Sequence, residues 1–231
     1  MPIPILSGLA RWRRAVSHSI QSHLILSRDF GHFRSIRTGE SADRDGNPIP
    51  WFTYPMVEFL EQLDFSQCSV FEYGSGNSTL YWAKHAREVV AVEDHRGWHD
   101  RMTPLLPANV EYRFREGDAY PAAIGENGDR RFDIVIIDGT RRLSCAKAAL
   151  AHTKPTGMVI VDNSGWVPKT TQVFRDADMI QVDMSGFAPV GKYTGTTTVF
   201  FGREARFRPR HAVQPQRGVG SVPPTHERRD T

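Results

Sequence analysis

The chain has 231 residues, 39% of them hydrophobic, so it can bury one full core as a single domain with extensions. Its net charge of +3 belongs to the two ends, because residues 1–50 carry +3, residues 203–231 carry +4 and residues 51–202 carry −4. This distribution argues against nucleic acid as a partner, and no apolar run is long enough to predict a membrane-spanning helix. The two cysteines, Cys68 and Cys145, are interpreted as reduced thiols, as in a cytoplasmic protein.

The N-terminal part, residues 1–50, is predicted to be an amphipathic helix followed by a loop over residues 29–50. Arginines lie between the apolar residues of the helix, and no acid precedes Asp29. The apolar residues, spaced by three or four, are Ile5, Leu9, Trp12, Val16, Ile20 and Leu24. Three interpretations stay open: a helix that packs on or covers its own domain, a peripheral membrane helix over residues 5–28, and a targeting segment.

The main domain is predicted to span residues 51–202. It opens with Pro50-Trp51-Phe52-Thr53-Tyr54-Pro55, which leads into a helix over Met56–Leu63. Aromatic residues this close to a ligand-binding turn are candidates either to cover a ligand or to pack in the core. Thr53 and Tyr54, which belong to the same stretch, are included among the candidate substrate residues.

A strand, a tight turn and a helix follow within Cys68–Trp82. Gly74 and Gly76 allow a ligand to approach the backbone closely, and Ser78 or Thr79 can cap the amides of the following helix. Glu72 lies at the end of the strand, two positions before the first glycine. A carboxylate there would repel a pyrophosphate and attract a ligand that carries an ammonium and a sulfonium.

Strands and helices alternate through the rest of the domain, and apolar runs such as Ile134–Ile137 are typical of a parallel sheet buried on both faces. The predicted strands are Glu88–Glu93, Val110–Phe114, Phe132–Asp138, Met158–Asp162, Met179–Asp183 and Thr196–Phe201. The predicted helices are His95–Leu106, Arg141–Thr153 and Pro168–Asp176. This order predicts a doubly wound α/β sheet between two layers of helices.

Five successive strands end at or near an acid, which the topology brings to one edge of the sheet. These acids are Glu72, Glu93, Asp118, Asp138 and Asp162, the last followed by Asn163. Glu93 is spaced to meet a ribose diol, and Asp118 is placed to accept from an exocyclic adenine amine.

These motifs resemble those of the class I S-adenosylmethionine-dependent methyltransferases. The matching parts are Glu72-Tyr73-Gly74-Ser75-Gly76, Val90–Glu93, Gly117-Asp118 and Phe132–Gly139. The resemblance implies a seven-stranded sheet ordered 3-2-1-4-5-7-6 with the seventh strand antiparallel, and methyl transfer to a small-molecule acceptor, with oxygen favoured. The implied cofactor-binding residues are Glu72, Gly74, Ser75, Gly76, Asn77, Ser78, Glu93, Asp118, Ala119 and Asp138.

Asp138 and Asp162-Asn163 also fall where metal-dependent O-methyltransferases hold a divalent cation. This similarity implies a site for Mg²⁺ or another divalent cation. Without a metal, Asp138 would position the methionine ammonium or act as a general base, and Asp162 with Asn163 would shape the acceptor pocket. Asp138 and Asp162 are the candidate catalytic residues, and Arg141 and Arg142 are candidates to meet an anionic acceptor.

Other functions fit the sequence less well. A nicotinamide dehydrogenase would need a third glycine where the chain has Thr79. A non-catalytic module of the same fold, which works through its N-terminal helix or its basic tail, remains the alternative. Residues 203–231 are predicted to form that tail, with disorder from about residue 211.

Overall fold

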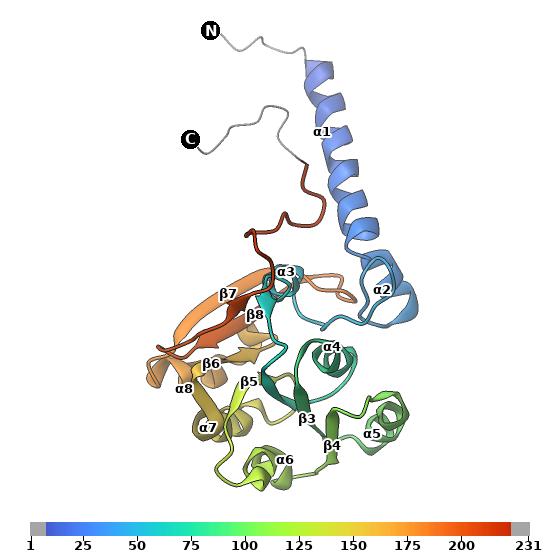
Figure 1. The fold of residues 1–231 in the computed structure, drawn as a ribbon. Coiled ribbons are helices and arrows are strands. Elements are labelled where there is room, and N and C mark those ends of the chain that lie inside the picture. Colours follow the sequence, from blue (N-terminus) through green and yellow to red (C-terminus); the bar gives the residue numbers. More distant parts are fainter. Residues whose placement is uncertain (1–7, 223–231) are drawn as a thin grey trace.

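The computed structural model describes residues 8–222, and a seven-stranded sheet forms its centre (Figure 1). The strands are β2 (Ser69–Tyr73), β3 (Glu88–Glu93), β4 (Val110–Phe114), β5 (Phe132–Ile137), β6 (Thr153–Val161), β7 (Ile180–Phe187) and β8 (Thr194–Phe201). Their order is β4-β3-β2-β5-β6-β8-β7, and β8 pairs antiparallel with both of its neighbours. Both the predicted strand order and the antiparallel last strand are confirmed.

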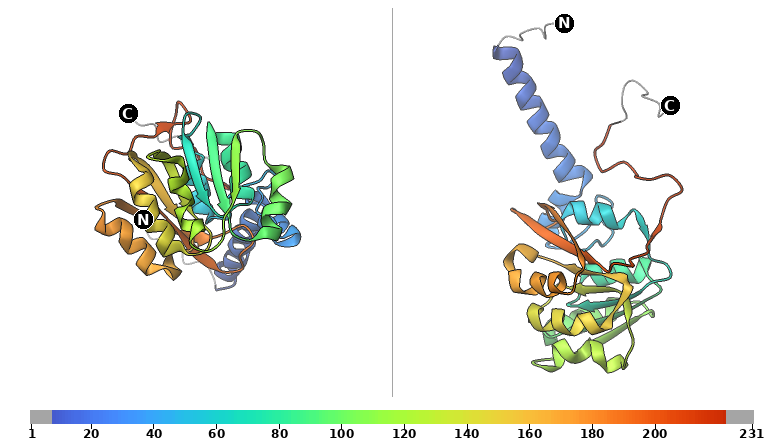
Figure 2. Two further views of the ribbon diagram at one scale, coloured as in Figure 1. Left: turned by 90° about the horizontal axis from the view of Figure 1, so that it is seen from below. Right: turned by 90° about the vertical axis from the view of Figure 1, so that its left-hand side faces the viewer.

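The central strands are buried on both faces because their apolar residues alternate between two cores. Along β5, Ile134 and Ile136 belong to one core, whereas Val135 and Ile137 belong to the other. The first core packs against α3 (Tyr54–Leu60) and α4 (Asn77–His85). The second packs against α6 (Ala119–Ala122), α7 (Arg142–His152) and α8 (Pro168–Asp176). Two helical layers thus enclose the sheet, as predicted (Figures 1 and 2).

Short helices complete these layers. α5 (Arg96–Met102) follows β3, lies beside the β4 edge and continues as the 3-10 turn η2 (Thr103–Leu105) (Figure 1). The other 3-10 segments are η3 (Ala123–Asn127) after α6 and η4 (Ser164–Trp166) after β6. No helix within residues 8–222 has both the length and the apolar character needed to cross a membrane.

The N-terminal part begins with α1 (Gly8–Leu24), which continues as the π-helical segment η1 (Ile25–Asp29). Ile5 of the predicted helix lies outside the described residues. The prediction of a loop over residues 29–50 is wrong at α2 (His32–Thr38). Gly31 and Gly39 flank α2 in left-handed conformations, and its buried side consists of His32 and Ser35. Two buried positions are too few to produce a helical period in the sequence.

The C-terminal segment runs back along the domain. β9 (Arg208–Pro209) pairs antiparallel with β1 (Leu63–Asp64). Further on, the backbone N–H of Gln216 donates to Gln62 Oε1 over 2.8 Å, and that of Val219 donates to Glu58 Oε1 over 2.5 Å. The disorder predicted from about residue 211 stays a prediction, although Gln214, Gln216 and Val219 bond Gln62 and Glu58 in the structure. Residues 223–231 lie outside the described residues.

Candidate functional site

The turn between β2 and α4 is a constrained piece of backbone at the carboxyl end of the sheet. Gly74 has φ +97°, and a Cβ added there would lie 3.1 Å from the carbonyl oxygen of Asp138. The N–H of Gly76 donates to Thr79 Oγ1 over 3.0 Å, and the indole N–H of Trp98 donates to the carbonyl of Ser75 over 2.8 Å. Only a residue without a side chain fits easily at Gly74, as the sequence predicts.

Glu72 lies behind this turn and is 0% exposed. Thr79 Oγ1 donates to its Oε2 over 2.6 Å, whereas Oε1 is buried without a hydrogen-bond partner among the described residues. Burial raises the pKa of Glu72 to about 7, although the nearby hydroxyls of Ser78 and Thr79 oppose the shift. A buried, half-satisfied carboxylate favours a cationic group as a ligand.

Glu93, at the end of β3, is held next to the same turn. Its Oε1 accepts from the backbone N–H groups of Asp94 and His95 at 3.1 and 3.0 Å. Its Oε2 accepts from the Ser75 hydroxyl at 2.7 Å, and that hydroxyl is also 2.7 Å from the Tyr112 hydroxyl. The structure therefore brings Glu93 and the glycine turn together, as predicted.

A cavity of about 280 Å³ opens at the turn. Five predicted cofactor residues line it: Ser75, Gly76, Asn77, Ser78 and Asp138. The rest of its wall comes from residues 38–41, Trp51, Trp98, Arg101, Met102 and Leu105. Of the two aromatic residues before α3, Phe52 is buried in the core, whereas Trp51 is 47% exposed and lines this cavity, so that covering a ligand stays a prediction for Trp51.

The sequence did not predict the contribution of α5 and η2 to this wall. Trp98, Arg101, Met102 and Leu105 read as an ordinary helical segment after β3, and only the tertiary arrangement turns them toward the cavity. Asn77, the first residue of α4, donates through Nδ2 to the carbonyl of Ser41 over 2.7 Å. This bond ties the N-terminal part to the turn.

Asp118 and Ala119 do not line the cavity. The Asp118 carboxylate is fully exposed and pairs with Arg141 over 3.1 Å, while Ala119 begins α6. Arg141 itself has φ +47° just before α7. The adenine-binding role of Asp118 and the acceptor-binding role of Arg141 stay predictions.

The residues predicted to bind a metal surround the guanidinium group of Arg142. The Arg142 guanidinium donates to Asp138 Oδ1 and to Asn163 Oδ1, each over 3.2 Å. It also donates to the carbonyl oxygens of Gly139, over 2.9 Å, and Asp162. No group of three or more His, Cys, Asp or Glu side chains within residues 8–222 is arranged to hold a metal ion. These residues do not fit a divalent cation, because the guanidinium bonds Asp138 Oδ1 and Asn163 Oδ1 and sets a positive charge beside both, while Thr197 bonds Asp162 Oδ1.

Both acids beside Arg142 have raised pKa values. Burial raises the pKa of Asp162 to about 6, although Thr197 Oγ1 donates to its Oδ1 over 2.6 Å. Burial and the nearby Asp162 carboxylate raise the pKa of Asp138 well above its usual range, and Arg142 partly offsets them. Asp138 lines the cavity, so it is the member of the pair placed to exchange a proton with a ligand.

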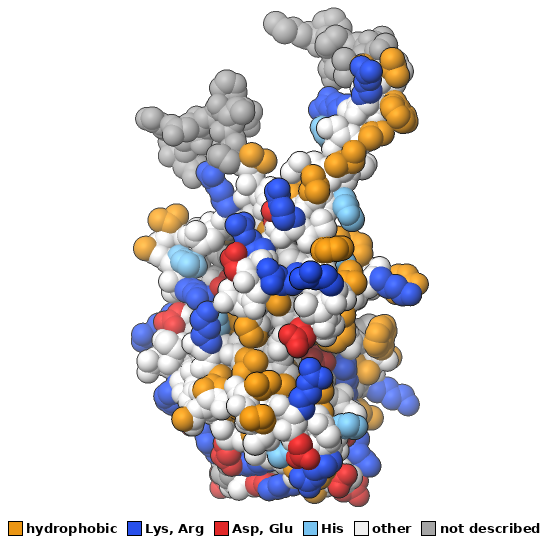
Figure 3. All heavy atoms as spheres, turned by 90° about the vertical axis from the view of Figure 1, so that its right-hand side faces the viewer, with side chains coloured by type: hydrophobic (Ala, Val, Ile, Leu, Met, Phe, Trp, Pro, Cys, Tyr) orange, Lys and Arg blue, Asp and Glu red, His pale blue; other side chains and the backbone are white. Residues whose placement is uncertain are grey.

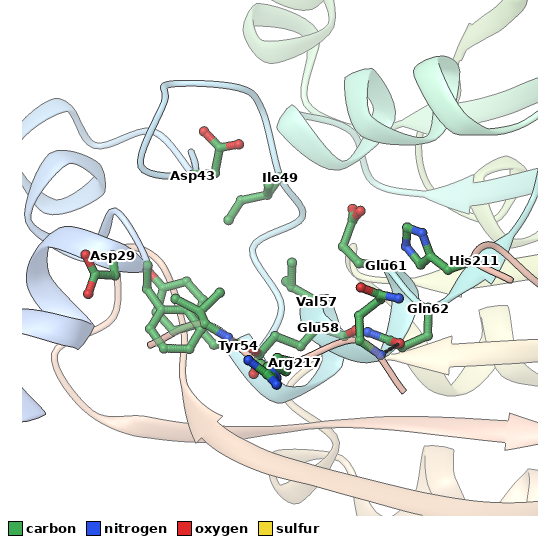
Figure 4. A pocket seen from close by; sticks show the side chains of 14 residues that line it. Asp29, Asp43, Ile49, Tyr54, Val57, Glu58, Glu61, Gln62, His211 and Arg217 are labelled. Atoms are coloured by element: carbon green, nitrogen blue, oxygen red, sulfur yellow. Dashed lines mark hydrogen bonds between the residues drawn. The ribbon is translucent and has the colours of Figure 1, made fainter. Parts of the chain in front are cut away.

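Thr53 and Tyr54 lie away from the glycine turn. Thr53 is buried, with its N–H donating to Thr197 Oγ1 over 3.0 Å and its hydroxyl donating to the Met184 carbonyl over 2.8 Å. Tyr54 lines a second cavity of about 240 Å³ between α3 and the C-terminal segment (Figure 4). The structure gives Thr53 a structural role and separates Tyr54 from the cofactor residues.

No protein-family model matches the sequence, and no curated protein sequence is significantly similar to it. Among solved structures, the chain is similar to the O-methyltransferase TomG from Streptomyces achromogenes, solved in complex with SAM. The TM-score is 0.50 and the identity 16%, over 81% of this chain and 96% of that one. It is also similar to the precorrin-6y C5,15-methyltransferase from Geobacter metallireducens GS-15, with a TM-score of 0.50 and 12% identity over 64% of this chain and 86% of that one. Together with the strand order, these similarities show that the chain has the fold of the class I S-adenosylmethionine-dependent methyltransferases.

Proposed function

We propose that this protein is a methyltransferase that takes its methyl group from S-adenosylmethionine and transfers it to an oxygen of a small molecule. The observation that carries the proposal is Glu72, whose buried Oε1 lacks a partner among the described residues directly behind the glycine turn. The ammonium of the methionine moiety is a suitable partner for that oxygen. The fold and the position of Glu93 support the same assignment.

Different residues of this chain would bind different parts of the cofactor. Glu72 would hold the ammonium, the Gly74–Gly76 backbone would let the ligand approach the sheet, and Glu93 would accept from the ribose hydroxyls. The bound cofactor supplies an activated methyl group on a sulfonium. The cavity wall around Trp51 and Trp98 would exclude water and align the acceptor.

Acceptor oxygen is favoured because a weakly acidic hydroxyl needs a base. Asp138 lines the cavity, and its raised pKa makes the carboxyl a better proton acceptor near neutral pH than an ordinary aspartate. Arg142 fixes this carboxyl from behind, so no metal is included in the proposal. Asp162 does not line the cavity. Its negative charge would raise the pKa of Asp138 and so strengthen Asp138 as a base.

Calorimetric titration with S-adenosylhomocysteine tests the cofactor site. Glu93→Ala should weaken binding by about ten- to a hundredfold, because a charged hydrogen bond contributes about 1.5 to 3 kcal/mol. Asp94→Ala is the matched control, since the side chain of this neighbouring acid bonds Thr140 instead of the turn. Absence of binding to the unmodified protein would refute the proposal.

Binding alone does not separate an enzyme from a non-catalytic module of the same fold. The distinguishing measurement is the formation of S-adenosylhomocysteine from S-adenosylmethionine with a panel of phenols, alcohols and carboxylic acids. Asp138→Asn should abolish turnover but keep cofactor affinity within about tenfold, because the amide keeps the shape of the side chain and loses its basicity. Cofactor binding without turnover on any acceptor class would favour the module.

A further inference from the structure

Helix α1 has no buried residue and projects away from the domain, as two views at right angles show (Figures 1 and 2). Its apolar side chains are open to solvent, and Leu9 and Trp12 are each 64% exposed. Val16, Ile20 and Leu24 continue the same side of the helix, with spacings of three or four residues. These five residues form an apolar stripe that the described chain does not cover.

The other sides of the helix carry basic residues among small and polar ones. Arg11, Arg14 and His18 lie opposite the stripe, and Arg13 flanks it. Residues 8–28 contain no acid. Figure 3 shows hydrophobic side chains along one side of the projecting helix and basic ones on the other.

A helix of this kind depends on an external surface for its stability. Most of the stability of a protein helix comes from packing of its amphipathic face, and without acids α1 cannot form the ion pairs between turns that would stabilise it. The described chain offers the stripe no surface. The apolar side therefore needs something to cover it.

The charge and spacing of α1 identify that surface. A second copy of the helix would bring like-charged arginines together, and a heptad seam running from Leu9 through Trp12 and Val16 would next reach Ser19 and His23, which are polar. A bilayer with anionic headgroups attracts the arginines and buries the stripe, and Trp12 suits the boundary between headgroups and acyl chains. We propose that α1 binds the surface of an anionic lipid membrane and lies in its interface without crossing it.

The C-terminal segment adds positive charge at the same end of the molecule. It leaves the domain beside α1 in both views, and Gly220 lies against Ile25 at the base of the helix (Figures 1 and 2). Arg217 is exposed on this segment. Arg217 lines the second cavity beside Glu58, so the arginines of α1 itself carry the charge argument.

Flotation of the full chain with lipid vesicles tests the proposal. It should float with vesicles of phosphatidylcholine and phosphatidylglycerol and bind at least about tenfold more weakly to phosphatidylcholine alone or at high salt. The double variant Trp12→Ser, Ile20→Ser should lower binding to the anionic vesicles by at least about tenfold, whereas Gln21→Ala, on the opposite side, should keep it. Affinity for S-adenosylhomocysteine checks that the variants are folded, because no residue of α1 is buried or lines the cavity.

Two results would overturn the proposal. One is a full chain that does not bind anionic vesicles, or that binds neutral vesicles equally well. The other is a dimer, seen by light scattering, that the double variant converts to a monomer while vesicle binding is unaffected. The second result would assign the stripe to another copy of this chain.

Discussion

The buried carboxyl of Glu72 has a consequence for how cofactor affinity depends on pH. Burial raises its pKa to about 7, so at pH 6 this carboxyl is mostly protonated in the ligand-free protein. An ammonium favours the ionised form, and binding at pH 6 must therefore release a proton. Affinity for S-adenosylhomocysteine should rise by up to about tenfold per pH unit below pH 7 and then level off.

Calorimetry in two buffers of different ionisation enthalpy counts the protons released. The unmodified protein should release close to one proton at pH 6 and almost none through Glu72 at pH 8. Glu72→Gln is the control, because the amide keeps the shape of the side chain and cannot titrate. Equal proton release in both proteins at pH 6 would assign the titration to Asp138 or Asp162 instead.

Gly139, the residue directly after Asp138, is explained by its neighbour Tyr120. A Cβ added at Gly139 would lie 1.9 Å from the Tyr120 hydroxyl oxygen. That hydroxyl is buried and has no hydrogen-bond partner among the described residues. Gly139→Ala should lower the free energy of unfolding by about 1 to 3 kcal/mol, as measured by urea denaturation.

Tyr120→Phe supplies the matched control for this contact. Removing an unpaired hydroxyl should change stability by less than about 1 kcal/mol. When Tyr120→Phe is combined with Gly139→Ala, the missing hydroxyl leaves the added methyl group more room, so part of the loss should be recovered. Strict additivity of the two changes would show that the hydroxyl is not the obstacle.

At the scale of elements, Arg142 joins the ends of β5 and β6 to the start of α7. It bonds two side chains and two carbonyl oxygens, and its own side chain is only 17% exposed. Arg142→Ala should lower the free energy of unfolding by about 3 kcal/mol or more, because it leaves Asp138 without its cation. Arg142→Lys should be less damaging, since it keeps the charge and loses most of the fork of donors.

The same cluster predicts that neither the stability of the protein nor its affinity for the cofactor depends on a metal ion. A chelator, or added Mg²⁺, should leave the melting temperature and the affinity for S-adenosylhomocysteine unchanged, because the guanidinium uses the oxygens of Asp138 and Asn163. Differential scanning fluorimetry and calorimetry measure these two quantities. A melting temperature that rises with Mg²⁺ concentration would show that Arg142 yields its place to the ion.

The elements that the sequence predicted best are those with a single dominant signal. β3 and β4 begin and end at the predicted residues, and so does α8, where Pro168 fixes the first turn. β7 and β8 extend further than predicted, since they form a hairpin whose outer residues carry little apolar pattern. α2 was missed because its two buried positions, His32 and Ser35, are polar and add nothing to an apolar period.

At the scale of the whole molecule, the chain divides into a packed domain and a projecting helix. No residue of α1 is buried, whereas α2 is held to the domain by His32, whose Nε2 lies 2.9 Å from the Gly191 carbonyl oxygen. Deleting residues 1–24 should therefore change the free energy of unfolding by less than about 0.5 kcal/mol. A larger loss in urea denaturation would show that α1 packs on the domain in solution.

The part of the candidate site that the sequence could predict is the part that the order of the strands determines. Glu72, Glu93, Asp138 and Asp162 come together because parallel strands end at one edge of the sheet. The role of Arg142 and the cavity wall from α5 depend on side-chain directions that only packing decides. Asp118 follows the edge strand β4, where nothing fixes its side chain toward the cavity.

The bond from Asn77 Nδ2 to the Ser41 carbonyl joins the helix that begins at the glycine turn to the segment that follows α2. Arg101 and Glu40, 3.7 Å apart, link the same segment to α5. A shift of α1 and α2 at a bilayer would thus move one wall of the cavity, and the two binding equilibria would be coupled. Such coupling is reciprocal: the factor by which vesicles change the affinity for S-adenosylhomocysteine equals the factor by which that ligand changes vesicle binding.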